Sequence, residues 1–290
     1  KNQGNGRRST DHPDLTFPHD PRKQKRKSSP MTEYSPFEMI AFTGSRVLTD
    51  NTTVFVGTGL PIIASIHAQL THAPGLGMIF EAGPLAPVLE MGMPLSVGDT
   101  RACHKACYLK GLSSVFELTQ RGHADFAFIG GAQIDMYGNV NSTFEGGTYK
   151  AAKTRFPGSG GAGAMAANCE RSIIIMALEP RRFTAKLDFL TSIGYGDGSP
   201  DYREKSAVMG SGPYRVITNE ALFGFDEDTR RMTLLEVQKG KTADDIQQKV
   251  SFDLLISPDL GEMAEPSEGD LKLLREECDP DGYFLARKLK

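Results

Sequence analysis

Glu81 is a side chain whose type and position suggest catalysis. It follows an apolar run at residues 78–80, which is typical of a buried strand, and it precedes the small pair Ala82-Gly83. Active sites of α/β proteins lie at the carboxyl ends of parallel strands. The position therefore favours a functional carboxylate with space beside it. The alternative is a strand-end glutamate that caps a neighbouring helix.

A glycine-rich loop at residues 153–164 could stabilise negative charge. It contains Gly160, Gly161 and Ala162, followed shortly by a strongly apolar strand. Successive backbone N–H groups in such a loop can form a concave anion site or an oxyanion hole. The loop lacks the G-K-[ST] ending of a nucleotide-binding P-loop. A flexible surface loop is the alternative interpretation.

Two further stretches have the composition of ligand loops. Gly57 and Gly59 flank Thr58 in a tight turn where a strand gives way to a helix, but Ile62 stands where a dinucleotide fingerprint needs its third glycine. We therefore expect this turn to border some other ligand site. The second stretch, residues 130–143, follows another buried strand and offers amides and hydroxyls. Its Gln133, Asn139 and Asn141 indicate a ligand loop, with a plain polar turn as the alternative.

The four cysteines do not form a metal-binding pattern. Cys103, His104 and Cys107 cluster, but no second pair follows at zinc spacing, so we expect core thiols on a helix and no metal. Their small number and irregular spacing predict reduced thiols in a cytoplasmic compartment. The sequence contains no G-x-S-x-G, H-E-x-x-H or G-x-x-x-x-G-K-[ST] motif, which leaves serine hydrolases, zincins and P-loop enzymes without support.

Helical and strand patterns alternate along most of the chain. Ser35-Pro36-Phe37-Glu38 reads as a capping box that opens the first helix. The patterns predict helices at residues 36–48, 62–70, 111–121, 242–250 and 271–277, and strands at 54–56, 78–80, 126–129 and 172–177. The runs 214–218, 221–225 and 232–237 predict antiparallel hairpins or edge strands. The fold class is therefore α/β, with an open, mainly parallel sheet flanked by helices.

Charge divides the 290-residue chain into two parts. Residues 1–30 carry a net charge of +5 and residues 31–290 carry −8, for a total of −3. The first thirty residues contain almost no large apolar side chains and lack the apolar core of a secretory signal, so we expect a disordered tail upstream of a natural start at Met31. Residues 31–290 are expected to form one domain. Its acidic balance argues against nucleic-acid binding, and no apolar run is long enough to span a membrane.

Taken in order, the motifs resemble one known family. They are VGTGLP (56–61), APG (73–75), FEAG (80–83), SVGD (96–99), GGAQIDMYGNVNST (130–143), KTRFPGSGGA (153–162), RRF (181–183) and EECDPDGYF (276–284). The chain resembles the β subunits of family I CoA-transferases, most closely those of the glutaconate CoA-transferase type, over residues 38–283. The resemblance implies the NagB/RpiA/CoA-transferase fold and the transfer of coenzyme A from an acyl-CoA to a free carboxylic acid.

The resemblance also implies roles for residues. Glu81 matches the E-x-G nucleophile, which reacts in ping-pong order through a glutamyl-CoA thioester. Gly160, Gly161 and Ala162 match the oxyanion loop. Gly57, Gly59, Gln133, Asn139 and Asn141 match a loop on the CoA or substrate side. For Arg155, Arg181 and Arg182, contacts with CoA phosphates or a substrate carboxylate and an ordinary solvated role stay equally open.

The resemblance also implies a substrate, a partner subunit and the absence of a bound cofactor. Coenzyme A is a substrate, and no tightly bound cofactor is implied. The family's α subunit is absent from this chain, so the resemblance implies a separate partner in an αβ heteromer such as α₂β₂ or larger. A CoA-thioester hydrolase or decarboxylase on the same scaffold is the alternative function. The resemblance favours transfer, because family members of that other kind lack the glutamate that matches Glu81.

Overall fold

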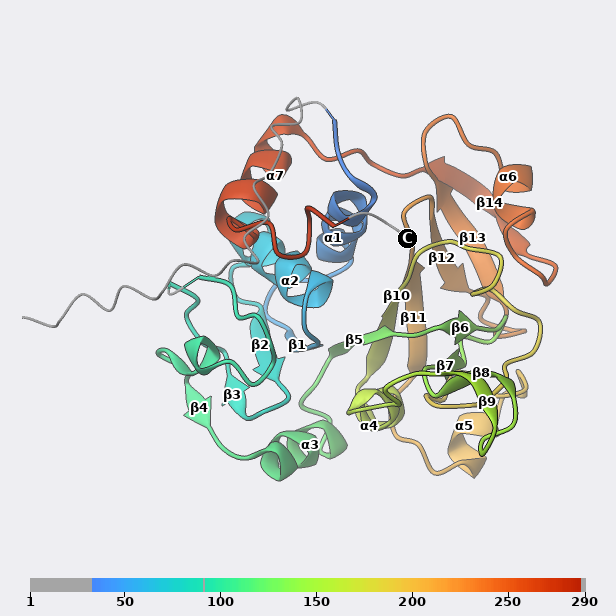
Figure 1. Ribbon diagram of the computed structural model, residues 1–290, viewed down its shortest axis with the longest axis horizontal. Coiled ribbons are helices and arrows are strands. Elements are labelled where there is room, and N and C mark those ends of the chain that lie inside the picture. The colour runs from blue at the N-terminus through green and yellow to red at the C-terminus, as the bar shows by residue number, and fades with distance from the viewer. Residues whose placement is uncertain (1–32, 91, 288–290) are drawn as a thin grey trace, which may run out of the picture.

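A ten-stranded mixed sheet organises the part of the chain that the computed structural model describes, residues 33–90 and 92–287. The expected disorder of residues 1–30 lies outside the described residues. The strand order is β14-β13-β12-β11-β10-β5-β1-β2-β3-β4 (Figure 1). Its centre is parallel and is formed by β11 (Gly212–Ile217), β10 (Arg171–Ile175), β5 (Phe126–Gly130), β1 (Thr53–Val56) and β2 (Gly77–Phe80).

Antiparallel strands extend the sheet on both sides. On one side lie β12 (Ala221–Phe225), β13 (Met232–Val237) and β14 (Leu255–Glu262), of which β14 runs parallel to β13. On the other side lie the short strands β3 (Pro84–Leu85) and β4 (Tyr108–Leu109). The α/β prediction with a mainly parallel central sheet is confirmed. The predicted antiparallel hairpins are confirmed for β11–β12 and β12–β13, and β11 also pairs with β10 in parallel.

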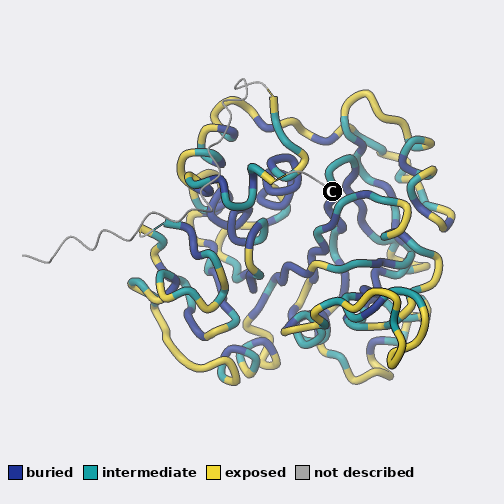
Figure 2. Tube along the Cα trace, in the orientation of Figure 1, coloured by how far each residue is buried: buried dark blue, intermediate teal, exposed yellow. Residues whose placement is uncertain are grey.

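Helices cover both faces of the central strands (Figure 1). One face carries α1 (Pro36–Arg46), α2 (Leu60–Thr71) and α7 (Glu268–Leu273), which continues into a π-helical turn at Leu274–Cys278. The other carries α3 (Leu112–Gln120) and α4 (Ala162–Asn168). Alternation along the strands explains both layers, because Val54 and Val56 pack under α1 and α2 whereas Phe55 packs toward α3 and α4. The buried chain is concentrated in these central strands and helices (Figure 2).

The predicted capping box of α1 is present. The Ser35 hydroxyl accepts from the Glu38 N–H at 3.2 Å, and the Glu38 carboxylate accepts from the Ser35 N–H at 2.7 Å. Arg275 then donates to Glu38 at 2.8 Å, which ties α1 to the C-terminal turn. The predicted cap of α6 (Ala243–Gln247) by Thr242 and Asp245 is likewise confirmed.

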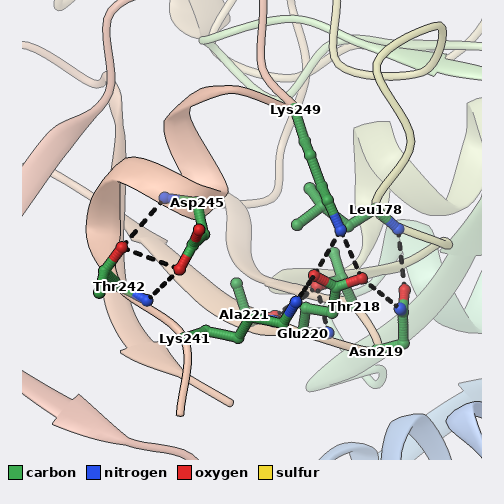
Figure 3. A network of polar contacts seen from close by, with 9 residues as sticks. All are labelled: Leu178, Thr218, Asn219, Glu220, Ala221, Lys241, Thr242, Asp245 and Lys249. Carbon is green, nitrogen blue, oxygen red and sulfur yellow. Dashed lines mark hydrogen bonds and ion pairs between the residues drawn. The ribbon is translucent and has the colours of Figure 1, made fainter. Parts of the chain in front are cut away.

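Polar contacts fix the β11–β12 turn to α6 and to the segment that follows β10 (Figure 3). Glu220 forms an ion pair with Lys249 at 2.5 Å and a longer one with Lys241 at 3.8 Å. Asn219 accepts from the Leu178 N–H at 3.0 Å. This network holds in place the chain that leaves the carboxyl end of β10.

Several small elements lie outside the predicted pattern. They are the hairpins β6–β7 (Gln133–Ile134, Val140–Asn141) and β8–β9 (Phe144–Gly147, Ala152–Arg155), the 3₁₀ turn at Thr100–Cys103, and α5 (Tyr202–Lys205). None of the helices within 33–90 and 92–287 combines the length and the apolar character that a bilayer crossing requires.

Candidate active site

The carboxyl ends of β10, β5, β1 and β2 lie side by side. They form the carboxyl-terminal edge of the sheet, hereafter simply the edge. The chain leaves β1 toward β2 on one side, and it leaves β5 toward β10 on the other. This reversal is the switch point at which α/β sheets open a crevice. The turn at residues 57–61 and the turn at residues 81–83 both follow directly from this edge.

Glu81 stands at that edge, directly after β2. Phe80 packs under α1 and α2, so strand alternation directs the next side chain to the face that carries α3 and α4. Glu81 is half-buried. Its carboxylate has neither a hydrogen bond nor an ion pair with any residue that the structure describes. A carboxylate held against the protein without an internal partner is available to react with a ligand.

Gly161 lies against this carboxylate. A Cβ atom built on Gly161 would stand 2.8 Å from Glu81 Oε1 and 2.7 Å from Cζ of Phe116, which lies on α3. Both distances are shorter than real Cβ contacts, so a side chain at this position would force the Glu81 or Phe116 side chain to move. The predicted nucleophile and the predicted oxyanion loop, far apart in the sequence, are thus brought together. Phe116 was not predicted, because an aromatic residue in an amphipathic helix carries no signal of a site.

The N–H groups of the loop differ in availability. The Ala162 N–H donates to the Ser159 carbonyl at 2.9 Å, which closes a turn. The N–H groups of Gly160 and Gly161 have no acceptor among the described residues. Gly160 has a positive φ of 49°, and a Cβ there would meet open space. The loop therefore offers two N–H groups without an internal acceptor, of which Gly161 lies against the carboxylate.

The position two residues after Glu81 requires a glycine, Gly83. Its φ is 134°, which L side chains rarely adopt, and a Cβ there would stand 1.7 Å from the Lys110 carbonyl oxygen. The Gly83 N–H donates to the Phe80 carbonyl at 3.0 Å, which closes the turn. The chain that leaves β4 thus passes over Gly83 and fixes the turn on which Glu81 is carried.

The loop that contains residues 96–99 packs beside the same turn. A Cβ on Gly98 would lie 3.8 Å from the Ala82 side chain, and the Val97 N–H donates to the Thr58 hydroxyl at 3.2 Å. Asp99 organises this loop. Burial alone would raise the pKa of Asp99, but hydrogen bonds from Arg101 and from backbone N–H groups lower it to about 2.

A cleft of about 880 Å³ opens at the same edge but on the face of α1 and α2. Gly130, Arg181 and Arg182 line it, and a smaller cavity of about 320 Å³ beside it is lined by Gly57 and Gly59. Glu81 lines neither cavity. The predicted residues Gly57, Gly59, Arg181 and Arg182 therefore lie on the face of the sheet that carries α1 and α2. The Glu81 carboxylate lies on the opposite face.

Glu179 partly neutralises the two arginines of the cleft. Its carboxylate lies 2.6 Å from Nε of Arg181 and 3.3 Å from Nε of Arg182. Burial raises the pKa of Glu179, but the hydrogen bond from Arg181 and the charge of Arg182 outweigh it and leave the pKa lowered. Arg182 also donates to the Gly131 carbonyl at 3.1 Å, which joins the cleft to the 131–147 loop.

The predicted amide residues are buried inside the 131–147 loop. Asn141 donates to Oε1 of Gln133 and to the Phe144 carbonyl, both at 2.7 Å. Asn139 donates to Asp135 at 2.8 Å and accepts from the Gly194 N–H at 2.8 Å. These side-chain groups form hydrogen bonds within the chain, and these bonds fix the loop backbone. Burial raises the pKa of Asp135 against the hydrogen bonds that it accepts from Asn139.

Arg155 and the cysteines complete the sequence-predicted positions. The Arg155 guanidinium lies over the Phe144 and Tyr149 rings, at 5.6 and 4.8 Å from their centroids. Cys103 and Cys107 are exposed, so the prediction of core thiols on a helix is wrong: a short 3₁₀ turn ends at Cys103, and no helix continues to Cys107. Across the described ranges, His, Cys, Asp and Glu side chains form no group of three that could hold a metal ion.

A Ser–His–Asp set also exists, which no sequence motif indicated. The Ser45 hydroxyl lies 2.9 Å from Nδ1 of His67, and Nε2 of His67 lies 3.2 Å from Asp270. Ser45 is 0% exposed and His67 is 2% exposed. The three residues join α1, α2 and α7, with Ser45 and His67 buried and Asp270 partly exposed. A hydrolytic role would need an accessible serine, so this set is a structural clamp.

Known proteins match this chain in sequence and in fold. The family model described as coenzyme A transferase matches residues 37–249. The chain belongs to the coenzyme A transferase family. It is 40% identical to the B subunit of glutaconate CoA-transferase of Acidaminococcus fermentans, over 88% of this chain and 96% of that protein. It is 32% identical to the B subunit of 3-oxoadipate CoA-transferase of Pseudomonas knackmussii, over 84% and 94% of the two chains.

The structure agrees with this membership. The crystal structure of glutaconate coenzyme A-transferase from Acidaminococcus fermentans superposes with a TM-score of 0.81 at 38% identity, covering 88% of this chain and 98% of that chain. The predicted resemblance to CoA-transferase β subunits and the predicted enzyme class are thereby confirmed. Membership of the coenzyme A transferase family also explains why so many short motifs, each weak alone, occur in this order along the chain.

Proposed function

We propose that this coenzyme A transferase subunit moves coenzyme A between an acyl-CoA and a free carboxylic acid through a covalent intermediate on Glu81. The observation that carries the proposal is the position of Glu81. Its carboxylate is half-buried, lacks an internal partner within the described chain, and lies against the backbone of Gly161 at the edge where the parallel strands end.

The chemistry balances in two half-reactions. The Glu81 carboxylate attacks the thioester carbonyl of acyl-CoA and expels the CoA thiolate, which leaves a mixed anhydride between the acyl group and Glu81. The thiolate then attacks the glutamyl carbonyl. The free acid leaves as a carboxylate, and Glu81 carries CoA as a thioester. An acceptor carboxylate reverses both steps, which gives ping-pong kinetics.

Each addition places a negative charge on an oxygen beside Glu81. The free N–H groups of Gly160 and Gly161 support their assignment as donors to this oxygen, and Ala162 keeps the turn closed through its bond to Ser159. A single oxyanion donor contributes about 3–4 kcal/mol to the transition state. The glycine at 161 thus has two functions: its backbone donates, and its missing side chain leaves room for the carboxylate.

The remaining predicted residues act on the same site less directly. In this proposal Gln133, Asn139 and Asn141 shape the 131–147 loop, and Gly57 and Gly59 leave the small cavity open at the end of β1. Arg181 and Arg182, which line the larger cleft, supply positive charge that a CoA phosphate or a substrate carboxylate could meet. No step of the mechanism requires a metal or a redox cofactor.

A second subunit completes the enzyme in this proposal. The two relatives described above are each named as the B subunit of their enzyme, which supports a separate α chain and an αβ heteromer, α₂β₂ or larger. A half-exposed Glu81 supports the same view, since a thioester or anhydride open to solvent would hydrolyse. Dicarboxylic acids of the glutaconate and 3-oxoadipate type are the first substrates to test.

The test replaces Glu81 by glutamine in the chain co-produced with an α subunit. Glu81→Gln keeps the size of the side chain but removes the nucleophile, so exchange of CoA across a carboxylate panel should fall by about a thousandfold or more. The matched control is Glu117→Gln, on the exposed surface of α3, which should keep full exchange. Retained exchange in Glu81→Gln would contradict the covalent mechanism. Consumption of acyl-CoA without exchange, unchanged in Glu81→Gln, would favour the alternative, a CoA-thioester hydrolase or decarboxylase.

A further inference from the structure

A further pocket, of about 730 Å³, lies at the opposite end of the central strands, where their amino ends meet. Its walls come from the first residue of β10, the beginning of β11 and the end of β12, together with the loops next to them. Its volume lies within the range of pockets that bind small molecules. The five residues of β10 span about 16 Å, which separates this pocket from the edge that carries Glu81.

The pocket is strongly basic. Four arginines line it, Arg171, Arg203, Arg215 and Arg230, against one acidic residue, Glu227. Within the residues that the structure describes, none of the four guanidinium groups forms an ion pair with a carboxylate. Residues 31–290 are acidic as a whole, so this concentration of unpaired positive charge runs against the composition of the domain.

Aromatic rings contact three of the guanidinium groups. The Tyr214 ring has Arg215 at 3.9 Å and Arg171 at 5.0 Å from its centroid. The Tyr195 ring has Arg230 at 5.4 Å. Stacking of this kind orients a guanidinium and leaves its N–H edge free to bind an anion. The four arginines carry the same charge and line one pocket, and an anion bound there would offset their mutual repulsion.

Arg203 provides a fixed charge in the wall of the pocket. It is 9% exposed and donates to the carbonyls of Gly210, Gly194 and Ala166 at 2.9, 2.9 and 3.1 Å. Carbonyl groups satisfy its hydrogen bonds but do not neutralise its charge. A buried cation without a carboxylate partner is costly, and an anion in the adjacent pocket would offset part of that cost.

We propose that this arginine pocket is a second ligand site, which binds a small anion carrying two or more phosphate groups. Guanidinium forks match phosphate oxygens in pairs, and several of them around one pocket suit a ligand of high negative charge. The site lies at the opposite end of the central strands from Glu81, so it is separate from the proposed transfer reaction and does not depend on it.

Isothermal titration calorimetry of the full chain with inorganic pyrophosphate at low ionic strength tests the proposal. The variants are Arg171→Gln and Arg230→Gln, because both residues lie at the pocket surface and their replacement should leave the fold intact. Each should weaken binding about tenfold. The matched control is Arg121→Gln, an exposed arginine at the end of α3 that carries the same charge, and it should change binding less than twofold.

The source of the phosphate is distinguished by a second titration with ATP. Tighter binding of ATP than of pyrophosphate, lost in the same two variants, identifies a nucleotide phosphate. Equal or weaker binding identifies a free phosphate compound. The proposal is overturned if neither probe binds, or if Arg121→Gln weakens binding as much as the pocket variants do. It is also overturned if the probes fail to bind while Arg171→Gln and Arg230→Gln break an association with another protein chain.

Discussion

At residue scale, the space around Glu81 is set by two glycines. Gly83 permits the chain to turn under the Lys110 carbonyl, and Gly161 permits the loop to reach the carboxylate. A Cβ is excluded at Gly83, and at Gly161 it would force neighbouring side chains to move. At Gly83 the obstacle is backbone, whereas at Gly161 it consists of the Glu81 and Phe116 side chains. A change at Gly161 therefore tests the site with less risk to the fold.

We expect Gly161→Ala to reduce CoA transfer by about a hundredfold to a thousandfold. The added methyl group would stand 2.8 Å from Glu81 Oε1, so it must displace either the carboxylate or the N–H donors, and the loss of one donor has an effect of this size. Exchange kinetics of the complete enzyme measure it. Gly163→Ala is the control, because its Cβ would meet nothing closer than 3.4 Å. Normal kcat in Gly161→Ala would show that the loop does not serve the carboxylate.

At element scale, the 131–147 loop combines short strands with buried amides that hold them in place. Asn141 is fully buried and links Gln133, the Phe144 carbonyl and the Thr143 N–H. The loop ends with β8, which forms a hairpin with β9, and the chain continues from β9 to Gly161. Disruption of these amide hydrogen bonds would therefore displace the backbone N–H groups of the loop that contains Gly161.

Asn141→Ala should lower the free energy of unfolding by about 2–3 kcal/mol, because it leaves the buried Phe144 carbonyl and Thr143 N–H without their partner. Urea unfolding followed by circular dichroism gives the value. The control is Asn168→Ala at the end of α4, whose side-chain amide makes no hydrogen bond within the described chain. Equal unfolding midpoints for the two variants would rule out a structural role for the network.

The clamp of α1, α2 and α7 predicts a pH dependence of stability. Burial lowers the pKa of His67 from its ordinary value of 6.5, against the opposing attraction of Asp270, while Ser45 faces the other ring nitrogen and His72 adds like charge. The unfolded chain therefore takes up a proton more readily than the folded one. Stability is complete above about pH 6.5 and falls as the pH is lowered through that value, by at most about 1.4 kcal/mol per pH unit.

Urea unfolding between pH 7.5 and pH 5 measures this slope. His67→Gln should reduce it, because the glutamine does not titrate. The same change at the exposed His123 should leave the slope of the parent chain intact. A slope that is identical in the parent and in His67→Gln would mean that another group causes the dependence.

The sequence predicts those elements whose signals are local. The capping boxes of α1 and α6 and the strands that end before Gly57 and Glu81 all follow from adjacent residues. The contact of Gly161 with Glu81 could not be derived this way, because it depends on where two distant segments meet. The strand β14 alternates poorly and contains Pro258, and β3 and β4 are two residues long, so none of the three has a usable pattern.

At the scale of the whole molecule, one edge of the sheet carries the carboxylate on one face and the large cleft on the other. Glu81 is half-exposed in the isolated chain. A reactive thioester there needs protection from water, which a second subunit would supply.

The chain alone should therefore show negligible transferase activity, and co-production with an α subunit should restore it. Light scattering after size exclusion gives the stoichiometry, for which a symmetric pair of αβ units is expected. A complex formed with Glu81→Gln should assemble normally but remain inactive, which separates assembly from chemistry. Full activity of the purified single chain would contradict the proposed requirement for a partner.

The covalent adduct on Glu81 is the most direct test of the whole account. The αβ complex is incubated with acyl-CoA in the absence of an acceptor acid, and the intact mass of each subunit is measured. We predict that this chain becomes heavier by one coenzyme A, that hydroxylamine removes the adduct, and that peptide mapping places it within residues 80–83. Glu81→Gln should form no adduct, and Glu117→Gln should form it normally. An unchanged mass while CoA exchange proceeds, or an adduct on another carboxylate, would contradict the account.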